Sequence, residues 1–397
     1  MISVEEYRAA VLAMAAGRVL PVRDVPLAAA AGRVLAAELT ARLTVPPFDN
    51  SAMDGFAVRA ADVASAPVVL RVVGESAAVS GPVPVLRPGT AVRVMTGARV
   101  PTGADAVVPV ELTDQRPGAA PLPERVRIDE PVEVGRHIRR AAEDLAAGDT
   151  VLPAGAVLTP AAIGAAASVG YGTLAVRARP RVAVVSTGAE LVPPGRQPAD
   201  GQIPDSNSVM LAALAAAAGA EVVAVLRSGD DPAELAGLLD GLPEVDLILT
   251  AGGVSAGAYE PVRQLGGGLE FCAVAMQPGK PQGHGLWAGV PLLAFPGNPV
   301  SSFVSFRVFG RPLLDALAGA RRPERPWRAV ALEAWRAPSG RRQYVPVVVE
   351  PDGVRPSHAR GSGSHLVASL HRADALAVVP EDWEAVAVGD RLEVMAV

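Results

Sequence analysis

Short apolar segments alternate with helix-like segments between residues 181 and 318, and this alternation constrains the fold more than any other feature of the chain. Strands are expected at residues 182–185, 221–226, 247–250, 271–275 and 292–294, and helices at residues 209–218, 232–239 and 300–317. Short apolar strands separated by helices are typical of βαβ units with a parallel sheet. We therefore predict a doubly wound, parallel βαβ domain at residues 179–320.

Two further segments have the composition of β structure. Residues 43–144 carry short Val-rich runs between prolines and glycines, and strands are expected at residues 68–73, 91–95, 106–110 and 125–128. That pattern is typical of a β-rich domain with tight turns. Residues 321–397 are strand-like at residues 345–349, 375–379 and 391–395, which predicts a C-terminal β domain.

Residues 1–42 and 145–178 are expected to form a small linking domain around the β-rich insertion. Ser3 and Glu6 fit a capping box, so a helix should run from there to about Ala16. A second helix is expected at residues 27–38, and a helix followed by a strand at residues 159–169 and 174–176. The chain as a whole is predicted to be a multidomain α/β plus β protein.

Composition excludes several classes of protein. The net charge is −5 and the arginines are scattered, which argues against nucleic-acid binding. No apolar stretch is long enough for a membrane span, and the N-terminus does not resemble a signal peptide. Cys272 is the only cysteine, so neither an intramolecular disulfide nor a cysteine-based zinc site is expected. We expect a cytoplasmic protein in which Cys272 is a core thiol.

Three loops that follow predicted strands are rich in small residues, at residues 186–190, 250–257 and 295–301. Ligands of doubly wound sheets bind outside the carboxyl ends of the strands. Glycine-rich backbone can offer N–H groups to an oxyanion, and a helix N-terminus favours an anion. None of the loops matches a P-loop or a dinucleotide fingerprint. Together they predict a phosphate or oxyanion site at one edge of the sheet.

Charged residues stand beside these loops. Lys280 is the only lysine among 36 Lys and Arg residues, which suggests a need for a compact ammonium charge. Glu190 and Asp230 each follow a predicted strand, and Mg²⁺ takes one or two carboxylates together with substrate phosphates. Capping of the next helix is the competing explanation for residues 230–232.

The five histidines show no metal-ligand spacing. Four of them are expected on surfaces or loops, namely His137, His284, His358 and His371. His365 ends a small-residue segment, residues 361–365, which fits either an anion site or a flexible loop.

Seven segments, in order along nearly the whole chain, resemble the molybdopterin molybdenumtransferase family, which includes bacterial MoeA and the gephyrin E domain. They are residues 47–58, 95–98, 139–145, 186–188, 252–255, 278–281 and 296–301. Residues 49–55, Asp-Asn-Ser-Ala-Met-Asp-Gly, are the most specific of them.

The resemblance implies an elongated homodimer whose site lies between the molybdopterin-binding βαβ domain of one subunit and the β-rich domain of the other. The implied reaction takes adenylylated molybdopterin and molybdate, releases AMP, and places molybdenum on the dithiolene sulfurs with the help of Mg²⁺ or another divalent cation. This is the last step of molybdenum cofactor biosynthesis. Molybdopterin adenylyltransferase and apo-molybdoenzymes are the implied partners.

The resemblance also assigns roles to residues of this chain. The implied catalytic residues are Asp54, Asp144, Glu190 and Lys280, and the implied metal ligands are Asp230 and Glu190. The implied substrate-binding residues are Thr96, Thr187, Gly252, Gly253, Ser255, Pro296, Gly297, Asn298, Pro299, Arg341 and Ser364.

Two positions depart from the commonest family pattern. Residues 256–260 lack an aspartate that many members carry, for which Glu260 is a candidate replacement, and Gln277 stands where many have a second lysine. These departures leave open a non-catalytic cofactor-binding or scaffold protein. An adenylyltransferase is a third hypothesis, because that activity occurs in proteins that share the βαβ domain. The β-rich segment that contains Asp54 argues against it.

Overall fold

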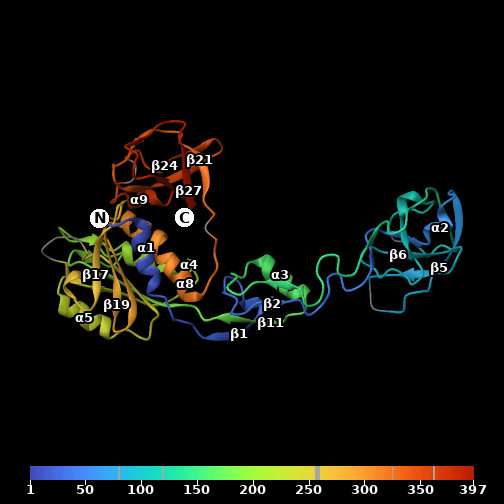
Figure 1. Ribbon diagram of the computed structural model, residues 1–397, viewed down its shortest axis with the longest axis horizontal. Helices are drawn as coiled ribbons and strands as arrows, with labels where there is room; N and C mark the ends of the chain where they lie inside the picture. The colour runs from blue at the N-terminus through green and yellow to red at the C-terminus, as the bar shows by residue number, and fades with distance from the viewer. Residues whose placement is uncertain (79–80, 119, 255–259, 324, 361–362) are drawn as a thin grey trace.

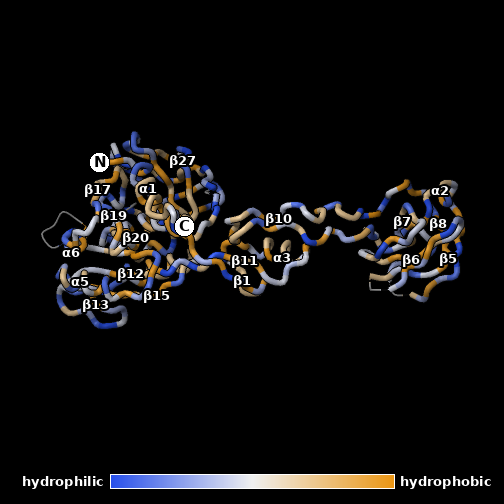
Figure 2. Tube along the Cα trace, turned by 60° about the horizontal axis from the view of Figure 1, so that its bottom comes forward, coloured by the Kyte–Doolittle hydropathy of each residue, from blue (hydrophilic) through white to orange (hydrophobic). Residues whose placement is uncertain are grey.

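The computed structural model describes residues 1–78, 81–118, 120–254, 260–323, 325–360 and 363–397. The molecule is elongated, with a large lobe at one end, a small domain in the middle and a β-rich domain at the far end (Figure 1). The same separation is visible in the rotated view of Figure 2. Among the described residues, no helix has the length and apolar character needed to cross a membrane.

A six-stranded sheet forms the centre of the large lobe, in the order β15-β12-β16-β20-β19-β17. These strands are β12 (Arg181–Thr187), β15 (Glu221–Ser228), β16 (Leu247–Ala251), β17 (Leu269–Ala273), β19 (Pro281–Trp287) and β20 (Val290–Phe295). The first four strands of that order pair in parallel. The predicted βαβ fold is confirmed.

The expectation of a wholly parallel sheet was wrong at β19, which runs antiparallel to both of its neighbours. Its sequence, Pro-Gln-Gly-His-Gly-Leu-Trp, has no β-branched residue and two glycines, so it lacks the composition of a strand. Pairing with β17 and β20 on either side makes these residues a strand despite that composition.

Helices cover both faces of this sheet. They are α1 (Val4–Ala13), α4 (Asn207–Ala217), α5 (Pro232–Asp240), α6 (Pro261–Gln264), α7 (Pro299–Ser305), the π-helical segment η3 (Phe306–Gly310) and α8 (Arg311–Ala318). Leu211 of α4 packs with Val184 of β12 on one face, and Leu235 of α5 packs with Val185 on the other. Adjacent residues of one strand therefore supply two separate cores, as the alternation of strand side chains requires.

Tyr7 of α1 is fully buried and contacts His284 of β19, with their ring centroids 5.1 Å apart. The expectation that His284 lies on a surface was therefore wrong, because the unpredicted strand β19 carries it into the core. Cys272 lies half-buried on β17, and burial raises the pKa of its thiol, which fits an unreactive side chain.

The middle domain contains two two-stranded sheets and a helix. Their elements are β1 (Val22–Pro26) with β11 (Thr173–Arg177), β2 (Leu39–Thr40) with β10 (Thr150–Leu152), and α3 (Pro160–Ser168). The helix expected at residues 27–38 was wrong, since only a short 3₁₀ turn forms there, η1 (Leu27–Ala29). Gly32 adopts φ 71°, and Leu35 bridges to Val176, so tertiary pairing overrides the helix propensity of the alanine-rich run.

The β-rich domain holds a five-stranded sheet in the order β7-β4-β6-β5-β8. Its elements are β4 (Gly55–Val58), α2 (Ala60–Val63), β5 (Val68–Ser76), β6 (Thr90–Val94), β7 (Ala106–Pro109), η2 (Val110–Leu112) and β8 (Arg125–Ile128), and β3 (Asn50–Ser51) pairs separately with β9 (Ile138–Arg139). Two stretches of chain connect this domain to the middle one and form a bridge between Val45 and Leu145.

The C-terminal domain packs beside the βαβ domain in the large lobe (Figure 1). Its elements are β21 (Trp327–Val330), β22 (Trp335–Arg336), β23 (Arg342–Glu350), β24 (Gly353–Pro356), α9 (Val367–Leu370), β25 (Ala375–Val379), β26 (Ala385–Val386) and β27 (Arg391–Ala396). The short strand β18 (Met276–Gln277), which precedes Lys280, pairs in parallel with β23. The two domains of this lobe are therefore joined by a shared ladder.

Candidate active site

A pocket of about 1620 Å³ lies at the carboxyl edge of the six-stranded sheet, against the C-terminal domain. Loops after β12, β15, β16 and β20 supply Thr187, Asp230, Gly252 and Pro296 to its walls. This is the edge at which open α/β sheets bind ligands. The short strands β13 (Leu191–Val192) and β14 (Ile203–Pro204) contribute Leu191 and Ile203 to its rim.

Most of the residues proposed from the sequence meet in this pocket. The twelve that line it are Thr187, Glu190, Asp230, Gly252, Gly253, Lys280, Pro296, Gly297, Asn298, Pro299, Arg341 and Ser364. Glu260, the candidate replacement for a missing carboxylate, also lines it. Ser255 falls outside the described residues.

Three of the proposed residues lie elsewhere in this chain. Asp54 and Thr96 belong to the β-rich domain, at the far end of the molecule in Figure 1. Asp144 is exposed in the connection between the β-rich and middle domains, where its backbone N–H donates to the carbonyl of Val45 at 3.1 Å. A single copy of the chain does not bring these carboxylates to the pocket.

Asp54 and Thr96 nevertheless form a unit of their own. The Asp54 carboxylate accepts hydrogen bonds from the Thr96 backbone N–H at 2.6 Å and from the Thr96 hydroxyl at 2.8 Å. These two bonds hold the pKa of Asp54 below its usual range. Asp54 is therefore an oriented, anionic side chain on an exposed surface.

The reversed strand β19 determines the position of Lys280, which directly precedes it. Because β19 is antiparallel to β20, it begins beside the residues at which β20 ends, and Gly283 pairs with Ala294. The residue before β19 therefore lies at the same edge as the carboxyl ends of the parallel strands. Gly279, with φ 102°, turns the chain there, and its carbonyl accepts a hydrogen bond from Gln282 Nε2 at 2.7 Å.

Gly252 allows the loops after β12 and β16 to touch. Its φ is 98°, and a Cβ atom at this position would lie 2.5 Å from the carbonyl oxygen of Thr187. Only glycine fits such a contact. Gly188 likewise leaves room for the carboxylate of Glu190, whose Oε2 would lie 2.5 Å from a Cβ atom there.

Three polar atoms at the pocket wall are buried without a hydrogen-bond partner among the described residues. They are Thr187 Oγ1, Asn207 Oδ1 and Gln277 Oε1. A buried polar group without a partner costs free energy, so a ligand that hydrogen-bonds to these atoms would be stabilised. The pocket therefore suits a polar ligand.

The sequence left two roles open for residues 230–232, helix capping and metal binding. Asp230 and Asp231 differ in which of these roles they can take. Asp231 is the N-cap of α5, and its Oδ1 accepts from the N–H of Ala233 at 2.9 Å. Asp230 lines the pocket and is exposed. The described residues include no group of three or more His, Cys, Asp or Glu that could hold a metal ion. Asp230 and Glu190 thus fit a hard cation only if a ligand supplies further oxygens.

Several pocket residues were not predicted. Asp205 is buried and accepts from the hydroxyls of Ser186 at 2.5 Å and Ser208 at 2.6 Å. Asn207 donates to the Gly297 carbonyl at 2.6 Å, which ties α4 to the loop after β20. The polar run Asp-Ser-Asn at 205–207, just before an apolar helix, was the available signal. The C-terminal domain adds Trp335, Arg336 and Arg360, and it also brings in His365, for which the sequence had left an anion site or a flexible loop open.

Charge in the pocket is mixed and comes from both domains. Lys280 belongs to the βαβ domain, while Arg336, Arg341 and Arg360 belong to the C-terminal domain. Cations on facing walls can bind an oxyanion between them. The carboxylates of Glu190 and Asp230 lie on the βαβ side, so the site can hold both anionic groups and a cation.

Family models match the chain in three parts. The MoeA N-terminal region (domain I and II) matches residues 2–170, a probable molybdopterin binding domain matches residues 183–316, and the MoeA C-terminal region (domain IV) matches residues 328–397.

Full-length relatives agree with these matches. The chain is 45% identical to molybdopterin molybdenumtransferase 2 of Mycobacterium tuberculosis, over 99% of each chain. It is 37% identical to molybdopterin molybdenumtransferase of Synechococcus elongatus, over 98% of each. Among solved structures, the molybdopterin biosynthesis moeA protein of Pyrococcus horikoshii OT3 superposes with a TM-score of 0.84 at 27% identity, covering 100% of both chains.

Proposed function

The chain belongs to the molybdopterin molybdenumtransferase family, and from this premise we propose that it inserts molybdenum from molybdate into adenylylated molybdopterin, with release of AMP. The observation that carries the proposal is the pocket, in which Lys280 and Arg341 stand on walls from different domains beside the backbone of Gly252 and Gly253. Molybdate and a phosphoanhydride are both oxyanions, and these groups suit oxyanions.

The residues of this chain would act by binding and orientation. Lys280 and Arg341 neutralise oxyanion charge, which brings molybdate and the anionic substrate together. The backbone N–H of Gly253 donates to phosphate or pterin oxygens, since that of Gly252 already donates to the carbonyl of Phe295 at 3.0 Å. Thr187 and Asn207 hydrogen-bond to the polar ring of the substrate, which would satisfy their buried atoms.

Mg²⁺ is a proposed cofactor of this site. Asp230 and Glu190 would hold it, since Mg²⁺ is usually bound through one or two carboxylates plus substrate phosphates. When bound, it would supply positive charge at the phosphoanhydride oxygens. Asp231, and not Asp230, caps α5, which supports the assignment of Asp230 to the metal.

We further propose that the protein is a homodimer in which the β-rich domain of one subunit completes the pocket of the other. Asp54 and Thr96 lie far from the pocket of their own chain, yet Asp54 is oriented and held anionic by hydrogen bonds from Thr96. Asp144 would approach the site in the same way. In a dimer, the second subunit would bring Asp54 and Asp144 to a pocket that they do not reach within one chain.

The substrate and product define the partners. A molybdopterin adenylyltransferase must supply the adenylylated substrate, and apo-molybdoenzymes must accept the cofactor. We propose a cytoplasmic location for the protein. The two alternative hypotheses, a non-catalytic scaffold and an adenylyltransferase, are not favoured, because relatives that match along their full length are named molybdopterin molybdenumtransferase.

The proposal is tested by AMP release from adenylylated molybdopterin in the presence of Mg²⁺, with and without molybdate. Molybdate-dependent release together with formation of active cofactor is the expected result. Tight binding of the substrate without any release would instead favour the non-catalytic hypothesis, with Gln277 and the lost aspartate as its cause.

A further inference from the structure

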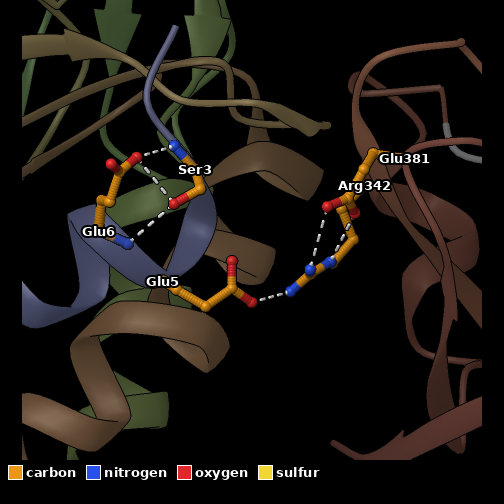
Figure 3. Close-up of polar contacts among 5 residues, drawn as sticks. All are labelled: Ser3, Glu5, Glu6, Arg342 and Glu381. Atoms are coloured by element: carbon orange, nitrogen blue, oxygen red, sulfur yellow. Dashed lines mark hydrogen bonds and ion pairs between the residues drawn. The ribbon is translucent and has the colours of Figure 1, made fainter.

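Arg342 connects the N-terminal helix to the C-terminal domain (Figure 3). Its Nη1 donates to the carboxylate of Glu5 in α1, and its Nε donates to Glu381 Oε2 at 3.2 Å. Glu381 follows β25 within the C-terminal domain, whereas α1 packs through Tyr7 and Val11 into a core made mainly by the βαβ domain, to which the C-terminal domain adds Tyr344 and Leu376. One guanidinium is therefore shared between two domains.

Both carboxylates of this ion pair are exposed, with 63% of the Glu5 side chain and 51% of the Glu381 side chain accessible. Arg342 is the more buried partner, with its side chain 25% exposed, and its planar group uses separate N–H donors for the two carboxylates. Although burial opposes the charge of Glu5, the hydrogen bond from Arg342 holds the pKa of that carboxyl below its usual range. Both partners are thus ionised at neutral pH.

The backbone around Arg342 is joined to the segment that leads to Lys280. The Arg342 N–H donates to the carbonyl of Ala275 at 2.9 Å. The N-terminal segment pairs with the same residues, because the N–H of Ala275 donates to the carbonyl of Ile2 at 2.8 Å. Ile2, residues 274–277 and the start of β23 therefore lie side by side, and Met276 and Gln277 of this group line the pocket.

Both neighbours of Arg342 in the chain, Arg341 and Gln343, line the pocket. Gln277, paired with Gln343 in the shared ladder, lines it as well and precedes Lys280 by three residues. A shift of Arg342 relative to α1 would consequently move Arg341 relative to Lys280. These two cations stand on the walls contributed by different domains.

We propose that Glu5 and Arg342 are positioning residues, whose ion pair sets the separation between Lys280 and Arg341 and thereby the affinity of the pocket for a tetrahedral oxyanion. The inference rests on the proposed function in that molybdate is taken as the oxyanion. Neither residue lines the pocket, so both act through the orientation of the C-terminal domain.

The chain offers a matched control in Glu6. It adjoins Glu5 in the same helix, but its carboxylate accepts from the backbone N–H of Ser3 at 2.7 Å and from the Ser3 hydroxyl at 2.8 Å, as part of the capping box (Figure 3). Glu5→Gln removes the interdomain ion pair, whereas Glu6→Ala removes the side-chain acceptor of the capping box. The two variants separate positioning from helix stability.

Calorimetric titration of each variant with molybdate tests the proposal. Glu5→Gln is expected to raise the Kd for molybdate about three- to fivefold, which is the upper range for an exposed ion pair. Glu6→Ala is expected to lower Tm and leave that Kd unchanged. The proposal is overturned if Glu5→Gln leaves the Kd unchanged, or if both variants raise it equally.

A distance measurement tests the orientation of the C-terminal domain relative to the βαβ domain without any ligand. Spin labels can be placed at Val209 in the βαβ domain and Val388 in the C-terminal domain, which are 53% and 67% exposed, in a Cys272→Ser background diluted with unlabelled protein. Glu5→Gln should broaden the distance distribution, and an unbroadened distribution would contradict a positioning role. If the unsubstituted protein binds no molybdate, the proposed function fails, while this measurement still decides the orienting role of the ion pair.

Discussion

At the scale of single residues, the site depends on which side chain stands at each strand end. Lys280 is the only lysine of the chain, and the turn at Gly279 delivers it to the carboxyl edge of the sheet. Thr187, Asn207 and Gln277 add buried polar atoms without partners among the described residues. The sequence suggested Lys280 and Thr187. It did not suggest Asn207, because an asparagine before a helix resembles an ordinary cap.

Lys280→Arg is expected to keep the fold and to lower kcat/KM for molybdate-dependent AMP release at least about tenfold. A planar guanidinium cannot reproduce the compact charge of an ammonium group, and a hydrogen bond to a charged group contributes about 1.5–3 kcal/mol. Steady-state kinetics with a thermal unfolding control measures this effect. Full activity in this variant would show that the position needs only positive charge.

Asp230→Ala and Asp231→Ala form a pair of adjacent substitutions with opposite expected effects. Asp230→Ala should raise the Mg²⁺ concentration for half-maximal activity about tenfold or more, with Tm nearly unchanged. Asp231→Ala removes the N-cap of α5 and should cost about 1 kcal/mol of stability without changing the Mg²⁺ requirement. Equal Mg²⁺ requirements in the two variants would place the metal at other ligands.

At the scale of elements, the four parallel strands of the βαβ sheet and the longer helices followed from apolar runs, because the side chains of these runs face a core. The strand at residues 125–128 was predicted with its observed bounds, and the helix predicted at 159–169 is α3, one residue shorter at each end. The sequence failed where tertiary pairing decides the structure. Residues 27–38 are alanine-rich yet bridge to neighbouring strands, and β19 lacks strand composition yet pairs on both sides.

The position of Lys280 at the edge of the sheet could not be predicted either, because β19 itself was not predicted. In a wholly parallel sheet, Lys280 would lie on a connection between strands. The pattern would then not determine the edge of the sheet at which it lies. The antiparallel direction of β19 is what brings this residue to the carboxyl ends of β16 and β20. The loops after β12, β16 and β20, by contrast, could be assigned to one edge from the βαβ pattern alone.

Gly252→Ala tests the contact between two of these loops, with Gly195→Ala as its control. Both glycines have positive φ, 98° and 86°, so each substitution should cost about 1 kcal/mol or more in backbone strain. Only at Gly252 would the new Cβ meet a carbonyl oxygen, that of Thr187, whereas Gly195 has open space around it. Binding titrations should show weaker substrate binding for Gly252→Ala alone. Equal binding in both variants would mean that the loop contact does not shape the site.

At the scale of the whole molecule, the chain is too extended to complete the proposed site alone. The pocket lies in the large lobe, and Asp54 lies in the β-rich domain at the opposite end (Figure 1). No pattern within one sequence shows which surfaces meet between two copies, so the implied dimer came only from resemblance to a family. The structural reason to expect a dimer is Asp54, whose carboxylate is oriented by Thr96 but lies far from the pocket of its own chain.

A mixture of two inactive variants tests whether the site is shared between two subunits. In the proposed homodimer, Asp54→Ala and Lys280→Ala would each damage both sites, but a mixed dimer would carry one doubly damaged site and one intact site. After subunit exchange at equal amounts, confirmed by native mass spectrometry, molybdate-dependent AMP release should reach about a quarter of the activity of the unsubstituted protein. Activity that stays at the level of the separate variants, despite confirmed mixed dimers, would contradict a molybdenum-inserting site shared between two subunits.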